Sequence, residues 1–279
     1  MKKNILRSTL LGGFLMVVLN LQGQSSFFTN EKYAKNGLSI QLGWQWNQTQ
    51  DLIFSPLIYA GSSFTNIGLQ YQRFQSKGMH QVSFGYGQSD ITAADPITFT
   101  DFGQSFTRIP SEIRQLHLHY GYAHLLKNTD AFQWYAGGLI ESQIHHTTYN
   151  FGLSDDDGYL LTNDLQAWLM AFWQWNGKNR IGVDVSFPLV AYLSRPTYAI
   201  VDNEEIQHGG SGLAFLYQEG EWASFDSYQA LDLNLTLDHR ISNAAAIQIG
   251  YGLEYHSYNA PLSISVLQNK FNLGLALSF

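Results

Sequence analysis

Glu254 and His256 are the two residues of this sequence whose types and spacing best suit acid–base chemistry. They stand two positions apart in "EYH", so in a β-strand their side chains share one face. A carboxylate beside an imidazole can orient or charge the ring, which then acts as a general base toward water. Ionisable pairs of this kind are also common structural features. We therefore expect no enzymatic activity, and we keep catalysis by this pair as the alternative.

The other histidines fall into two short groups, His117 with His119 and His145 with His146. A zinc ion needs three or four converging ligands. A pair spaced by two supplies at most two ligands, and only one of two adjacent histidines can share their face. We expect these side chains to be hydrogen-bonded filling of an interior, with no metal and no cofactor.

Three acidic clusters stand between the apolar segments, in "SDDDG" (Asp155 to Asp157), "DNEE" (Asp202 to Glu205) and "EGE" (Glu219 to Glu221). They are consistent with cation binding or with selection of a charged partner. Solvated loop charge is the simpler interpretation, and we favour it.

The first 23 residues have the composition of a secretory signal peptide, with Lys2, Lys3 and Arg7 before an apolar run that ends near Leu21. They hold three of the 15 Lys and Arg residues and none of the 22 Asp and Glu residues, so residues 24–279 carry a formal charge of −10. This charge argues against nucleic acid as a partner. Aromatic residues are 15% of the chain and charged residues only 13%, so we expect part of the surface to face something other than water.

Most of the chain alternates between apolar and small or polar residues with a period of two, which indicates β-strands. In "FNLGLALSF", for example, Phe271, Leu273 and Leu275 oppose Asn272 and Gly274. Strands of this kind are predicted at 37–47, 63–75, 80–93, 110–126, 131–149, 161–175, 180–190, 227–240, 244–258 and 265–279. The first four long linkers are 48–62, 94–109, 150–160 and 191–226, and they alternate with tight turns.

Two architectures fit this pattern: a soluble β-sandwich or lipocalin-like barrel, and a transmembrane barrel. Many of the predicted strands reach a dozen residues, longer than the 5–6 or so typical of soluble sheets. The polar face is rich in Gln, Asn, Ser, His and Gly, which suits a crowded lumen. Long loops that alternate with tight turns are typical of outer-membrane barrels. We therefore predict an all-β, antiparallel, up-and-down transmembrane barrel of about ten strands.

The signal peptide, the strand pattern and the closing "NLGLALSF" resemble outer-membrane β-barrel proteins of Gram-negative bacteria. The resemblance implies an outer-membrane location, contact with lipid and lipopolysaccharide, and folding by the barrel-assembly machinery, for which a terminal aromatic such as Phe279 is the signal. The pair Glu254 and His256 is similar to the Asp-x-His pair at the outer mouth of omptin proteases, which also have ten strands. The second acidic pair of omptins has only a loose counterpart in Asp155 to Asp157.

On the lumen side, turn positions predict that Asp232 and Lys270 both lie opposite Gly252 and form an ion pair across it. Asn234 or Asn272 would supply further hydrogen bonds. His117 and His119 belong to the same predicted lumen network. On the lipid side we predict Leu42, Trp44, Leu118, Tyr120, Val183, Leu233, Leu235, Ile249, Leu273 and Leu275, with Trp46 in the outer aromatic girdle and Trp173 or Trp175 in the periplasmic one.

A ten-stranded lumen is only slightly wider than one that side chains fill, so a general porin is not expected. The sequence predicts a structural, partner-binding or narrow-pore protein that acts through its extracellular loops. Linker 191–226 is the longest and carries the apolar runs "PTYAI" and "SGLAFLY" beside acids. We expect it to cover the mouth or to dock an extracellular or outer-membrane protein partner. The alternative function is an omptin-like surface hydrolase whose site, the pair Glu254 and His256, lies at the outer mouth of the barrel.

Overall fold

The computed structural model describes residues 36–93, 98–101, 103–107, 111–129, 131–150, 155–196 and 220–279. The predicted signal peptide, residues 1–23, and the acidic residues Asp202 to Glu205 and Glu219 lie outside this part of the chain. None of the described residues belongs to a helix long and apolar enough to cross a membrane.

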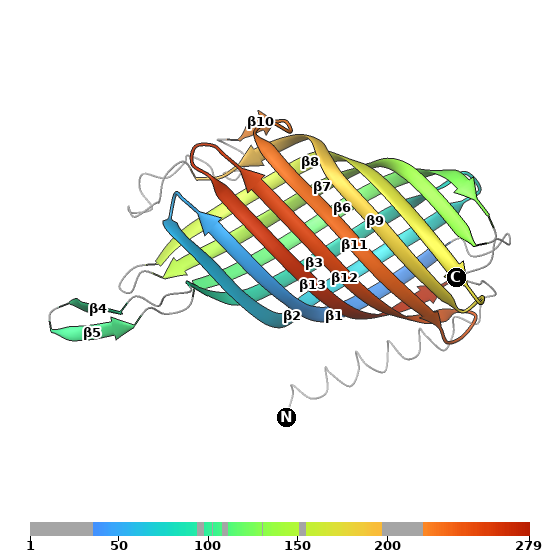
Figure 1. Cartoon of the computed structure of the whole chain (residues 1–279), viewed down its shortest axis with the longest axis horizontal. Coiled ribbons are helices and arrows are strands. Elements are labelled where there is room, and N and C mark those ends of the chain that lie inside the picture. Colours follow the sequence, from blue (N-terminus) through green and yellow to red (C-terminus); the bar gives the residue numbers. More distant parts are fainter. Residues whose placement is uncertain are drawn as a thin grey trace, which may run out of the picture.

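Ten long antiparallel strands close into a barrel (Figure 1). They are β1 (Asn36–Asp51), β2 (Ser55–Gln75), β3 (Gly78–Ala93), β6 (Ser111–Asn128), β7 (Phe132–Asn150), β8 (Asp155–Trp175), β9 (Asn179–Ser194), β11 (Tyr228–Arg240), β12 (Ala245–Tyr258) and β13 (Ile264–Ser278). Each strand pairs with the next in this order, and β13 pairs with β1 from Gly37–Ser278 to Asp51–Ile264. The predicted up-and-down barrel and its ten strands are confirmed.

Three short strands complete the sheet structure. β4 (Thr98–Asp101) and β5 (Gln104–Thr107) form a hairpin of their own between β3 and β6. β10 (Glu221–Ala223) pairs with residues 191–193 of β9. Both lie at the end of the barrel that carries the connections after β1, β3, β7, β9 and β12, which we call the loop end (Figure 1). The opposite end, where β2, β6, β8 and β11 turn tightly into the next strand, is the turn end.

The outer face of the barrel carries a continuous apolar belt. All ten residues predicted to face lipid point outward, and none of them is buried. On β1 the belt runs from Leu38 to Trp46, and eight steps of about 3.3 Å on a strand tilted by about 40° give a height of roughly 20 Å. Trp173 lies next to the turn end and stacks on Phe132 at 5.9 Å, as predicted for a girdle at that end.

Above the belt, toward the loop end, the two faces of the strands exchange character. The outward residues become polar, as in Gln48 on β1 and Gln88 on β3. Large apolar residues now point inward and are buried, as in Tyr59, Ile91 and Leu193, while the inward residues of β1 stay polar. Because a strand surrounded by water needs its apolar face inside, this exchange indicates that the loop end projects beyond the bilayer.

The exchange also explains where the predicted strand ends are wrong. Residues 48–62 were predicted to be a long loop, but they belong to β1 and β2 except for the three-residue connection Leu52–Phe54. Residues 191–194 belong to β9, and Asp155 to Asp157 open β8 instead of lying in a loop. In these segments the outward residues are no longer apolar although the strand continues. The alternation therefore stops, and the sequence was wrongly interpreted as a loop.

The position of the belt predicts that an arginine on the outer face of β1 destabilises the barrel by an amount that depends on its height. Leu42→Arg should destabilise the folded barrel by about 2–4 kcal/mol, because it places a charge in the middle of the hydrocarbon layer. Gln48→Arg, six residues further on the same face, should cost about 0–1 kcal/mol. Urea unfolding of the barrel in lipid vesicles measures both, and equal costs would contradict the position of the belt.

Phe279 as an assembly signal stays a prediction. Its backbone closes the seam, since Asn36 N lies 3.2 Å from Phe279 O and Phe279 N lies 3.1 Å from Asn36 O. Its side chain is exposed. We expect Phe279→Asp to reduce the heat-modifiable, folded form in outer-membrane fractions, with export unchanged. Phe279→Trp is the matched control, and wild-type levels of folded Phe279→Asp protein would refute the role.

Candidate functional site

A polar cavity of about 140 Å³ lies in the lumen at the level of the belt. It has room for several water molecules, since one water needs about 10–15 Å³ measured in this way. The lining includes His117, His119, Glu141, Asp232, Glu254 and Lys270. These residues come from β6, β7, β11, β12 and β13, so the closed sheet itself brings them together. The predicted lumen residues therefore do lie at one site.

Lys270 forms its ion pair with Glu254, at 2.5 Å between Nζ and Oε1. Its predicted position opposite Gly252 is confirmed. The predicted position of Asp232 is wrong, because Asp232 pairs in register with Glu254, and Asn234 takes the place opposite Gly252. The predicted Asp232–Lys270 ion pair is accordingly replaced by Glu254–Lys270, two residues further along the neighbouring strand.

The two predicted asparagines take part in hydrogen bonds with partners that the sequence did not indicate. Asn234 Nδ2 donates to Asp184 Oδ1 at 3.1 Å. Asn272 Oδ1 accepts from Asn66 Nδ2 at 2.6 Å. A Cβ atom at Gly252 would lie 3.1 Å from Asn234 Oδ1, so glycine leaves room for this part of the network.

Two pairs of acidic residues face each other directly in this layer of the barrel. Asp232 is in register with Glu254, and Glu141 is in register with Asp164 on the β7–β8 pair, which β9 separates from β11. Gln166 bridges the second pair, donating to Glu141 at 2.7 Å and to Asp164 at 2.9 Å. Like charges at such positions repel each other, so the amide group and Lys270 stabilise the layer. Glu141, Asp164 and Gln166 could not be assigned to the lumen from the sequence, because the segments that carry them lack a clean alternation.

His117 and His119 fill the lumen as predicted. The ring of His119 lies 2.9 Å from Gln81 Nε2 and 2.9 Å from Ser83 Oγ, measured to its Nε2. His117 packs over Gly85, where any Cβ atom would collide with its ring. Among the described residues, no group of three or more His, Asp or Glu side chains is placed to hold a metal ion.

His256 is buried inside the lumen, and the position at the outer mouth expected for the pair Glu254–His256 is wrong. Its Nδ1 lies 2.8 Å from the hydroxyl of Tyr228, its Nε2 lies 3.9 Å from Asp232 Oδ1, and its ring packs against His145 at 5.5 Å. Only 2% of its surface is exposed. Glu254 is engaged by Lys270, so neither partner is free to face an external substrate.

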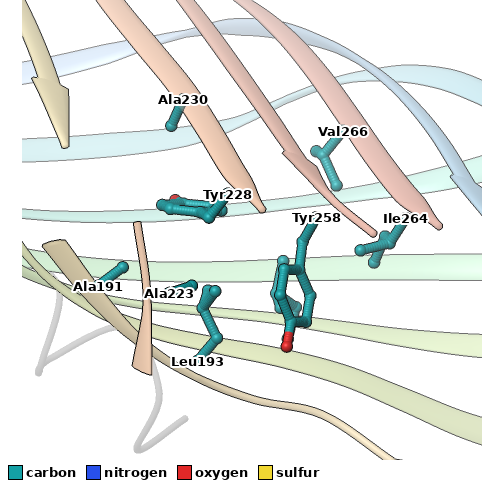
Figure 2. Close-up of a cluster of buried hydrophobic side chains, with 9 residues drawn as sticks. Ala191, Leu193, Ala223, Tyr228, Ala230, Tyr258, Ile264 and Val266 are labelled. Atoms are coloured by element: carbon teal, nitrogen blue, oxygen red, sulfur yellow. The ribbon is translucent and has the colours of Figure 1, made fainter. Parts of the chain in front are cut away.

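A cluster of buried apolar side chains closes the lumen between this layer and the loop end. Figure 2 shows most of it, with side chains from β9, β10, β11, β12 and β13 that converge in the interior. Its members are Leu160, Ala191, Leu193, Ala223, Tyr228, Ala230, Tyr258, Ile264 and Val266. A second cluster of Tyr59, Ile91, Ala93, Ile113 and Tyr149 fills the opposite wall at this end. Together they form what we call the apolar plug.

Two further buried ion pairs lie above and below the polar layer. At the loop end, Arg195 contacts Asp51 at 2.5 Å and donates to the carbonyl of Leu262 at 2.7 Å. Burial lowers the pKa of the Arg195 guanidinium from its usual range, and the Asp51 carboxylate opposes that shift. At the turn end, Arg180 contacts Asp238 at 2.7 Å. Each pair joins strands or connections that are distant in the sequence.

The register can be tested through Lys270. Lys270→Met should cost about 3–5 kcal/mol of folding free energy, because it leaves Glu254 as an uncompensated buried charge. Adding Glu254→Gln should recover most of this loss, whereas adding Asp232→Asn should recover less. Urea unfolding of the two double mutants in lipid vesicles makes the comparison. If Asp232→Asn recovered more of the lost stability than Glu254→Gln, the ion pair of Lys270 would be with Asp232, as the sequence predicted, and the structural register would be contradicted.

Comparison with known proteins gives a similarity of fold. No protein-family model matches the chain, and no curated protein matches it in sequence. Among solved structures, the outer membrane protease OmpT from Escherichia coli aligns with a TM-score of 0.57 at 7% identity, over 92% of this chain and 99% of that chain. The translocator domain of the autotransporter NalP from Neisseria meningitidis aligns with a TM-score of 0.46 at 9% identity, over 100% and 98%. By its architecture, the chain is a ten-stranded transmembrane β-barrel of the outer-membrane type.

Proposed function

We propose that this protein is a closed outer-membrane barrel that does not conduct solutes and that acts by binding a partner at its loop end, on the cell surface. The observation that carries the proposal is the apolar plug, whose buried side chains occupy the lumen between the polar cavity and the loop end. Water and ions avoid a dry apolar constriction of this kind. With conduction disfavoured, the surfaces left for function are the rim and the connections at the loop end.

The connection between β9 and β10 is our first choice for the binding element. Residues 197–219 contain the apolar run "SGLAFLY" together with Asp202, Glu204 and Glu205. The apolar run favours a protein partner, and the acids favour a partner that presents basic groups. The structure ties both ends of this connection to the barrel, through Arg195 on one side and through the pairing of β10 with β9 on the other.

The omptin-like hydrolase remains the alternative, with less support. The fold is shared with OmpT, but at 7% identity the likeness extends to the fold alone. His256 lies beneath the apolar plug, and Glu254 is held by Lys270. A substrate outside the cell would have no route to this pair unless the plug moved.

Conductance measurements test the closed lumen. In planar lipid bilayers the purified barrel should give no current steps above the lipid background, because the plug excludes water from the loop end. A general porin in the same membranes is the positive control. Stable current steps that depend on the amount of this protein would overturn the proposal.

Loop excision tests the binding role. Replacing residues 199–217 with a short Gly-Ser linker should leave a heat-modifiable barrel, because the ten described strands close into a barrel without them. The excised protein should lose surface binding to partner cells or proteins. Removing the β4–β5 hairpin, residues 98–107, is the matched control and should retain binding. Full binding after excision of 199–217 would show that this connection is not the binding element.

A further inference from the structure

The apolar outer face rises higher on one side of the barrel than on the others. On β9 the exposed residues Leu189 and Val190 continue the belt, and Tyr192 follows Val190 on the same face. Beside Tyr192, on β10, Trp222 is 74% exposed, and Phe225 in the next turn is 61% exposed. On β1 and β3 the outward residues at comparable heights are polar, as in Gln48 and Gln88. We call Tyr192, Trp222 and Phe225 the aromatic rim.

The aromatic rim is held in place by the surrounding structure. Trp222 is in register with Tyr192, and their rings meet edge to face with centroids 5.5 Å apart. The neighbouring residue Ala223 points inward and is part of the apolar plug. The turn after it is closed by hydrogen bonds of 3.0 and 2.9 Å from the backbone N–H groups of Ser227 and Tyr228 to the carbonyl of Ser224. The exposed rings therefore have a fixed direction, away from the lumen.

We propose that the aromatic rim is a lipid-binding surface that contacts the interfacial region of the outer leaflet. The aromatic rim is continuous with the belt, since the two residues from Val190 to Tyr192 raise the apolar surface by only about 5 Å along the barrel axis. This height corresponds to the border between hydrocarbon and headgroups, where Trp and Tyr are enriched because their rings are apolar and their N–H and O–H groups are polar. Exposing the two large rings of Trp222 and Phe225 to water would be unfavourable in free energy.

The proposal has a consequence for the loop end. Because the apolar surface is higher at β9 and β10 than at β1 and β3, the barrel should tilt toward this side or draw lipid up along it. Either response fixes the end of the 197–219 connection at the membrane surface, since β10 directly follows that connection. This inference stands apart from the proposed binding role and does not require it.

The absence of cysteine from the sequence allows single nitroxide labels to test the rim. Trp222→Cys and Phe225→Cys are labelled separately, and each barrel is placed in phosphatidylcholine vesicles. The ratio of collision rates with oxygen and with a water-soluble nickel complex then reports lipid contact. Leu42→Cys is the reference for lipid, and Gln48→Cys on the opposite wall is the reference for water. Heat modifiability confirms that each labelled protein is folded, and the two rim positions provide independent measurements.

We expect oxygen-to-nickel ratios at 222 and 225 that are severalfold above the ratio at 48 and below the ratio at 42, because Leu42 lies in the middle of the hydrocarbon layer and the rim lies at its border. Ratios at both rim positions equal to that at 48 would overturn the proposal, because the rings would then face water. Spin–spin broadening that disappears on dilution with unlabelled protein would also overturn it, since the rim would then be an interface between two copies of the chain.

Discussion

The structure depends on one constraint: the same ten hydrogen-bonded strands must pass from lipid into water without a break. A backbone in hydrocarbon has to satisfy all of its polar groups internally, and a closed ladder of strands does this. The side chains have to change instead. Within the bilayer the apolar face is outside, as at Leu42, and beyond the bilayer it is inside, as at Tyr59 and Leu193. The height at which this exchange occurs determines where apolar side chains fill the lumen at the loop end.

The exchange divides the lumen into a polar part and an apolar part. Where the outer face meets lipid, the interior receives polar side chains such as the pair Lys270–Glu254, and one wall, formed by β3, β6, β7 and β8, adds an apolar cluster that includes Leu139 and Trp168. Where the outer face meets water, apolar side chains form a compact core around buried polar residues such as Asp51 and Arg195. Buried charges are tolerated at three levels because each has a partner: Arg180 with Asp238, Lys270 with Glu254, and Arg195 with Asp51. A filled lumen is thus a consequence of the strand pattern and of the small barrel, and binding at the rim is the function that such a lumen leaves open.

The sequence was sufficient to predict the strands within the bilayer and the faces of those that alternate cleanly, whereas β7 and β8 alternate too weakly to reveal Glu141 and Asp164. It failed at the loop end, where most of residues 48–62 continue β1 and β2 and the apolar residue Tyr59 points inward. It also failed by two residues in the register of β11 and β12. A shift of two leaves every side chain on its predicted face, so the apolar pattern cannot detect it. The turn decides the register, and Ile241 N bonds to Ala245 O, which places Asp232 opposite Glu254 and changes the partner of Lys270. The burial of His256 could not be predicted, because its neighbours His145, Tyr228 and Val266 come from three other strands, β7, β11 and β13.

Thiol reactivity along β12 tests the exchange of faces most directly, because this strand passes through both environments. Single cysteines at Ile249, His256, Ser257 and Tyr258 would be exposed to a membrane-impermeant maleimide in lipid vesicles. The account predicts reaction at 257 alone: 249 faces lipid, and 256 and 258 lie in the apolar plug or directly beneath it. Reaction at 256 and 258 as fast as at 257 would contradict the account, because water would then enter the lumen from the loop end.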